Sequence, residues 1–127
     1  MSNRIEDILQ FWFGAFPTPY TADVSKADMW FKNGAAYDSE IFINFGVDYE
    51  RACNGELDHW QDSYRGRLAL IILLDQFLRH IHRGTAQAFA QDEKAQFLCV
   101  DGIGAGDDSK YHSIERSFFY LPLEHAE

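Results

Sequence analysis

Between Arg65 and Arg83 the chain contains an uninterrupted apolar run of seven residues, Leu68 to Leu74. A helix that is apolar on every side belongs in the interior of a fold. The run is too short to cross a membrane, which requires about 20 apolar residues. The sequence therefore predicts a buried central helix over residues 65–83, around which the other elements must pack.

Helical rather than strand periodicity also marks the neighbouring segments. From Ile5 to Phe13, apolar residues recur three and four positions apart, which predicts an amphipathic helix capped by Ser2 or Asn3. We expect further helices at residues 37–54, 85–100 and 114–121, and a flexible loop at residues 102–109. Gly55, Gly84 and Pro122 are the expected stops, and Ser113 the expected cap of the last helix. Four or five helices without a sheet predict a single all-α domain, an antiparallel bundle over residues 1–127.

The expected core faces follow from the same spacing. In the helix at residues 37–54, Gly46 costs about 1 kcal/mol relative to alanine, so we expect close packing or a bend there. The helix at residues 85–100 is expected to turn five apolar residues inward, namely Ala86, Phe89, Ala90, Phe97 and Val100.

Charge and cysteine content restrict the partners and the compartment. The chain has 11 basic and 20 acidic residues, a net charge of −9, which disfavours general binding to nucleic acid or to an anionic membrane. Cys53 and Cys99 form no closely spaced pair, and acidic residues stand where a signal peptide would be apolar. We therefore expect a cytoplasmic protein with two free thiols and no membrane or nucleic-acid partner.

Several short motifs occur in a fixed order along the chain. They are Ile8–Gly14, Trp30-Phe31, Phe45-Gly46, Gly55-Glu56-Leu57, Leu68–Phe77, Arg83-Gly84-Thr85, Ala88-Phe89-Ala90 and Phe119–Pro122. With these motifs the chain resembles the bacterial domain-of-unknown-function 924 family. The resemblance implies an all-α fold similar to tetratricopeptide-like helical arrays, and it implies no activity.

The chain departs from the family pattern at three positions. Leu78 replaces a usual proline, His80 a usual asparagine and Ala126 a usual serine. Because proline kinks helices, the central helix is expected to be straighter here. The resemblance also implies further C-terminal helices beyond Glu127, so either this form is shortened or a partner supplies the missing packing surface.

Charged residues of the central helix suggest one candidate site. Asp75, Arg79 and Arg83 follow one another at four-residue spacing and share a helix face, and Gln76 is adjacent to Asp75. Two arginines on one face can bind a carboxylate or phosphate. The acid–base groups of this predicted anion site are His125 and Glu127, approaching from the C-terminal segment.

The same residues also fit a purely structural network. Buried charges require partners, and Asp75 and Arg79 could pair with each other and with Asp92, Glu115 or Glu124. Both interpretations stay open on sequence grounds.

No motif predicts a metal or a cofactor. His80 and His82 are two positions apart and face different directions on a helix, and no metalloprotease motif occurs. The glycines from Gly102 to Gly106 lack the phosphate-loop pattern, and Asp107 follows them.

Two functions of different classes remain. The first is a non-catalytic module that binds a protein, a peptide or a second copy of itself through the aromatic-rich ends of the chain, around Trp12, Phe13, Trp30, Phe31 and Phe119. The second is a small enzyme or ligand-binding protein with the anion site of Asp75, Arg79, Arg83 and His125.

Overall fold

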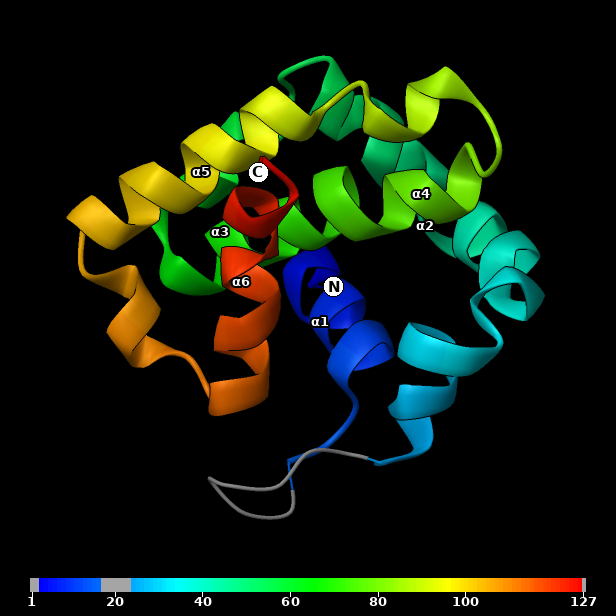
Figure 1. The fold of residues 1–127 in the computed structure, drawn as a ribbon. Coiled ribbons are helices and arrows are strands. Elements are labelled where there is room, and N and C mark those ends of the chain that lie inside the picture. The colour runs from blue at the N-terminus through cyan, green and yellow to red at the C-terminus, as the bar shows by residue number, and fades with distance from the viewer. Residues whose placement is uncertain (1–2, 17–23, 127) are drawn as a thin grey trace.

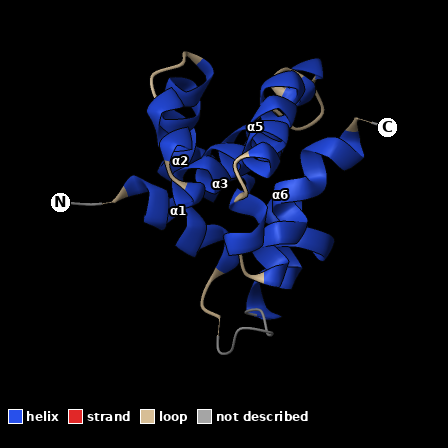
Figure 2. Ribbon diagram, turned by 90° about the vertical axis from the view of Figure 1, so that its left-hand side faces the viewer, coloured by secondary structure: helices blue, strands red, loops and turns tan. Residues whose placement is uncertain are grey.

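The computed structural model describes residues 3–16 and 24–126, and among these residues it contains helices and no strand (Figure 2). The predicted all-α fold is confirmed. No helix in the described part of the chain is long and apolar enough to cross a membrane. The α-helices are α1 Arg4–Phe13, α2 Asp38–Cys53, α3 Tyr64–Ile71, α4 Leu78–Ile81, α5 Asp92–Gly104 and α6 Ser113–His125. The shorter turns are η1 Val24–Lys26, η2 Asp28–Lys32, η3 Gly34–Tyr37, η4 Asp58–Asp62, η5 Ile72–Phe77, η6 Ala86–Phe89 and η7 Asp107–Lys110.

A continuous rod formed by α3, η5 and α4 corresponds to the predicted central helix. Every residue from Leu68 to Leu74 is buried, as expected, and α1, α2, α5 and α6 all contact the rod (Figure 1). Within the rod η5 is a π-helical turn, and a helix straighter than that of family members with proline at position 78 stays a prediction. Leu78 has the backbone N–H that proline lacks, but this N–H bonds to the carbonyl of Leu73, five residues back, so the wider turn persists.

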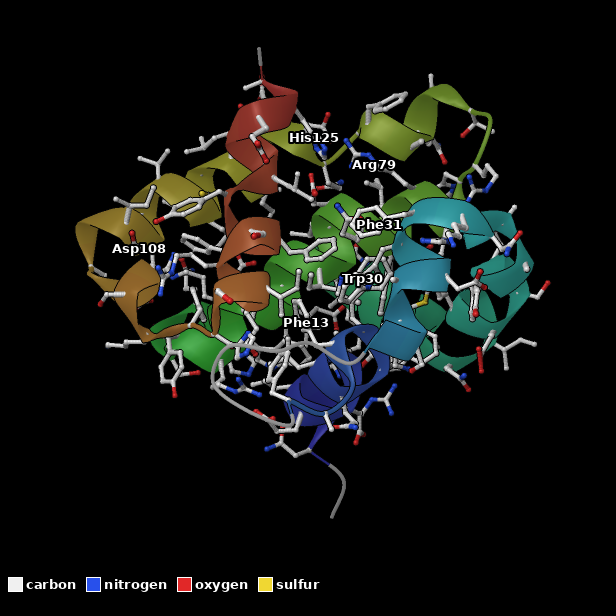
Figure 3. The ribbon with its side chains drawn as sticks, turned by 60° about the horizontal axis from the view of Figure 1, so that its bottom comes forward. Phe13, Trp30, Phe31, Arg79, Asp108 and His125 are labelled. Carbon is white, nitrogen blue, oxygen red and sulfur yellow. The ribbon has the colours of Figure 1, made fainter. Side chains whose placement is uncertain are left out.

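Aromatic side chains from both ends of the chain fill the space beside the rod. Trp12, Phe13 and Phe119 are buried, and the ring of Phe118 packs edge-on against those of Trp12 and Phe13. Figure 3 shows Phe13 and Trp30 close together in the interior, whereas Phe31 is largely exposed. The ends of the chain are therefore mainly core.

Helix α5 differs from the prediction in position and in orientation. Its inward face is formed by Ala95, Leu98, Cys99 and Gly102, whereas Phe97 and Val100 point to solvent, as does Phe89 of η6. The expected loop at residues 102–109 is also wrong, since α5 continues to Gly104. The reason is local packing: a Cβ at Gly102 would lie only 2.7 Å from Arg67 Cδ and 2.9 Å from Phe119 Cζ.

Helix α6 continues past the expected stop at Pro122. Pro122 is buried within it, and the helix ends at His125. The cap is His112 rather than Ser113: the His112 side chain accepts from the N–H of Ile114, and Glu115 accepts from the N–H of His112. One lost backbone hydrogen bond near a helix end does not stop the helix when the proline packs against the core.

Helix α2 presents apolar side chains to solvent on the face opposite its buried one. The exposed fractions are 61% for Phe42, 77% for Ile43 and 75% for Val47. The close packing expected at Gly46 is absent, because a Cβ there would meet only the Phe42 ring, at 3.6 Å. Asn3, one of the two expected caps, does cap α1.

Candidate functional site

The π-helical turn of the rod places a buried carboxylate where three elements converge. Asp75 is 1% exposed, and its Oδ2 accepts a 2.7 Å hydrogen bond from Gln76 Nε2. Its Oδ1 lies 3.0 Å from Nδ1 of His125, at the end of α6, and 3.4 Å from Nη1 of Arg79. Three of the sequence-predicted residues therefore surround Asp75.

The guanidinium of Arg79 has most of its donors engaged by the protein. Nη1 donates to the backbone carbonyl and the carboxylate of Asp75. Nη2 lies 3.3 Å from Asp92 Oδ1 and 3.2 Å from His125 Nδ1, and Figure 3 shows Arg79 and His125 next to each other. The ring of Phe89 faces the same guanidinium at 5.3 Å. Arg79 therefore forms the ion pairs with Asp75 and Asp92 that are expected if these residues form a structural network.

These contacts decide what the Asp75 cluster can bind. Two carboxylates face one arginine, so the net charge of the cluster is not positive in either charge state of His125. An incoming anion would have to displace Asp75 or Asp92 from Arg79 and would meet the remaining carboxylate. The geometry at Arg79 therefore favours the ion-pair network over an anion site.

Arg83, the other predicted anion ligand, belongs to a different cluster. Its Nε and Nη2 bind both oxygens of Asp38 in α2, at 2.6 and 3.0 Å. His80 lies beside this pair, with Nδ1 2.7 Å from Asp38 Oδ1. The Arg83 side chain is 47% exposed, and no described residue accepts from its Nη1. The structure thus divides the predicted site into two clusters. The cluster around Asp75 and Arg79 is enclosed, and the cluster of Asp38, His80 and Arg83 is open to solvent.

Burial and charge act against each other in the Asp38 cluster. Burial lowers the pKa of His80 below its ordinary value, although the neighbouring Asp38 carboxylate acts in the opposite direction. Burial alone would raise the pKa of Asp38. The hydrogen bonds and charges of Arg83 and His80 outweigh burial, so the pKa of Asp38 is lowered. In the fold the neutral imidazole and the ionised carboxylate are therefore favoured.

Other predicted site residues have limited roles or lie outside the structure. Gln76 holds Asp75, and Glu127 lies outside the described residues. Within residues 3–16 and 24–126, no group of three or more histidine, cysteine or acidic side chains could hold a metal ion. Cys53 and Cys99 are free thiols.

The buried Arg67 and the partly exposed Arg65 form contacts that were not predicted. Arg67 donates to Asp107 at 3.0 Å, to Asp101 at 3.0 Å and to the carbonyl of Leu98 at 2.9 Å. Arg65 binds Glu115 at 2.9 Å and Glu6 at 2.7 Å. The sequence did hold a clue to these ion pairs. The rod is the basic segment of an acidic chain, so its arginines could be expected to pair with carboxylates of other elements.

Beside the Asp38 cluster, α2 and α4 border an apolar groove. Two adjoining hollows have Phe42, Ile43 and Ile81 as shared lining residues. One extends to Asp38 and His80, and the other runs along α2 to Asn54 and Glu56. We call this surface the α2–α4 groove; it is lined by Asp38, Ser39, Phe42, Ile43, Gly46, Val47, Tyr49, Glu50, Arg51, Asn54, Glu56, His80 and Ile81.

Comparison with known proteins places the chain in a family without an assigned activity. Residues 8–127 match the family described as "Bacterial protein of unknown function (DUF924)". The chain is also similar to a solved structure described as a protein of unknown function, ATU0120 from Agrobacterium tumefaciens, with 35% identity and a TM-score of 0.82. That match covers 96% of this chain and 64% of the Agrobacterium chain, so this chain spans less than two thirds of its relative. None of the curated proteins compared with the chain matches it. The match over nearly the whole chain and the shared helical fold show that it belongs to the bacterial DUF924 family.

Proposed function

We propose that the protein is an interaction module that binds a basic amphipathic helix of a partner protein in the α2–α4 groove. The observation that carries the proposal is the exposure of Phe42, Ile43 and Val47 beside Ile81. Single exposed apolar residues are ordinary, but neighbouring ones that line a continuous groove are typical of an interaction surface. The aromatic ends, where binding was first expected, are mainly core.

The charge of the rim determines the kind of partner. Glu40, Ile43, Val47 and Glu50 follow one stripe of α2, so glutamates stand at both ends of its apolar part, and Glu50 lines the groove itself. Neither glutamate has an ion-pair partner among the described residues. The basic lining residue Arg51 is paired with Glu56. A partner helix with lysines or arginines beside its apolar face would complement this rim.

The same rim disfavours a second copy of the chain. Two copies docked through this groove would bring Glu40 and Glu50 of one copy near those of the other. Each chain already carries a net charge of −9. We therefore assign the groove to a different protein and treat self-association as an alternative outcome of the test.

Fluorescence anisotropy with two labelled peptides tests the proposal. Each peptide has about 18 residues and a leucine face; one carries lysines on its polar face and the other glutamates. The lysine peptide should bind with micromolar affinity and more weakly at high salt, and the glutamate peptide should not bind. Equal binding of both peptides, or no binding of the lysine peptide, would contradict the proposal.

Two matched variants locate the binding. Val47→Asp places a charge in the groove, and Val100→Asp places the same charge on the exposed face of α5. Val47→Asp should abolish binding of the lysine peptide, whereas Val100→Asp should leave it unchanged. Concentration-dependent dimers in analytical ultracentrifugation that disappear in Val47→Asp would instead assign the groove to a second copy.

A further inference from the structure

We propose that His125 acts as a general base for hydrolysis, positioned by Asp75, at a site separate from the α2–α4 groove. Asp75 lies in η5 and His125 at the end of α6, and the two meet because α6 continues past Pro122. The Nδ1–Oδ1 distance of 3.0 Å is that of a hydrogen bond between an imidazole and a carboxylate.

The buried carboxylate determines where the imidazole carries its proton. A hydrogen on Nδ1 of His125 satisfies Asp75 Oδ1, 3.0 Å away, whereas the other tautomer would turn a lone pair toward the carboxylate. Arg79 Nη2, a donor 3.2 Å from the same Nδ1, favours the other tautomer, but Nη2 can donate to Asp92 instead, so we assign the hydrogen to Nδ1. In the neutral ring Nε2 then has the lone pair. No described residue pairs with Nε2, and the His125 side chain is 30% exposed. The basic nitrogen is therefore available to an external proton donor.

The surroundings keep this arrangement in place. Gln76 holds Oδ2 of Asp75, so the carboxylate cannot rotate away without losing that bond. Arg79 lies against both the carboxylate and the imidazole, and Asp92 in turn holds Arg79. A histidine oriented by a buried carboxylate is the pairing used by hydrolytic enzymes, in which the carboxylate fixes the tautomer and stabilises the imidazolium. Wider π-helical turns such as η5 also recur at functional sites.

The proposed step needs only water and an activated ester. Nε2 accepts a proton from a water molecule while the water oxygen bonds to the acyl carbon. The bond from that carbon to the leaving oxygen then breaks, and the imidazolium returns its proton to the solvent or to the leaving oxygen. With p-nitrophenyl acetate as the probe, the products are acetate and p-nitrophenol, and no oxidant, metal or cofactor takes part.

Hydrolysis of p-nitrophenyl acetate by the purified chain and three variants is the test. The chain should hydrolyse the ester faster than imidazole at equal concentration. His125→Gln should remove that excess, at least tenfold, whereas His59→Gln, at an exposed histidine of η4, should not change it. A rate no higher than that of imidazole, or full activity in His125→Gln, would overturn the proposal.

A nitrogen NMR measurement separates the role of Asp75 from a structural one. In the unmodified chain the ¹⁵N shifts of neutral His125 should show the hydrogen on Nδ1. Asp75→Asn offers an amide that can donate to Nδ1, so it should move hydrogen to Nε2 and lower the hydrolysis rate at least tenfold. An unchanged tautomer together with an unchanged rate would overturn the positioning role. If Asp75→Asn does not fold, the hydrolysis rate of His125→Gln, a substitution at an exposed residue, still tests the general-base proposal. Peptide binding in the α2–α4 groove should be unaffected by His125→Gln, so the two proposals fail separately.

Discussion

Arg79 lies in α4 and Arg83 lies just beyond the end of the rod at Ile81, which is two residues short of the predicted helix end, and their surroundings differ. The start of α5 and the end of α6 meet around Arg79, which is 24% exposed and contacts Asp75, Asp92 and His125. Among the described residues, Arg83 has its hydrogen-bond partners in Asp38 of α2 and His80, and its side chain is 47% exposed. Two identical side chains of one motif thus have different roles: neighbouring helices enclose Arg79 on the α5–α6 side, whereas the α2 side stays open.

The largest effect expected from this difference concerns stability. Arg79→Ala should lower the free energy of unfolding by about 3 kcal/mol, because it leaves Asp75 buried without its cationic partner. Arg83→Ala is the matched control and should cost about 0.5 kcal/mol, since Asp38 is partly exposed and keeps His80. Urea unfolding followed by circular dichroism measures both values. Equal losses would show that the two arginines are equally enclosed.

A pair of glycines tests the same contrast in helix packing. Gly102→Ala on the enclosed side should cost about 2 kcal/mol, because its Cβ would overlap Arg67 and Phe119. Gly46→Ala on the open side should raise stability by about 0.5 to 1 kcal/mol, because α2 gains helix propensity and the Cβ meets only the Phe42 ring. Thermal unfolding of the two variants shows directly whether each substitution lowers or raises the stability of the fold. A stabilising Gly102→Ala would contradict the packing of α5 on the rod.

The smallest effect is a pH dependence at the open cluster. The lowered pKa of His80 means that its contribution to stability is present above the ordinary histidine pKa of 6.5 and is lost as the pH falls below it. The lowered pKa of Asp38 adds a contribution that is present above 3.8 and is lost in stronger acid. Between pH 7 and pH 5 the unmodified chain should therefore lose more stability than His80→Asn, measured by urea unfolding. Parallel pH profiles would exclude His80 as the source.

The sequence predicted the features that depend on one segment. The apolar run from Leu68 to Leu74 required a buried helix, and the spacing from Ile5 to Phe13 required an amphipathic one. The pairing of Arg79 with Asp75 and Asp92 followed from the need to neutralise a buried charge. Each of the two helix predictions depended on the pattern of one segment. The ion-pair prediction depended only on one arginine and the acidic residues available to it.

The sequence could not predict features that depend on contacts between distant segments. In α5 an alternative helical face with Phe97 and Val100 had the stronger apolar pattern, whereas the observed face packs Gly102 closely against Arg67 and Phe119. The pairing of Arg83 with Asp38 joins residues 45 positions apart. Likewise, whether Pro122 ends α6 depends on what the proline packs against, which no local pattern reveals.

Methyl NMR of the chain titrated with the lysine peptide tests most directly whether the open α2 side is the binding surface. The methyl signals of Ile43, Val47 and Ile81 should shift with a common saturation curve. Those of Val100 and Ile103, which are exposed apolar residues of α5, should not move. Shifts concentrated at Val100 and Ile103 would contradict the assignment of function to the open side.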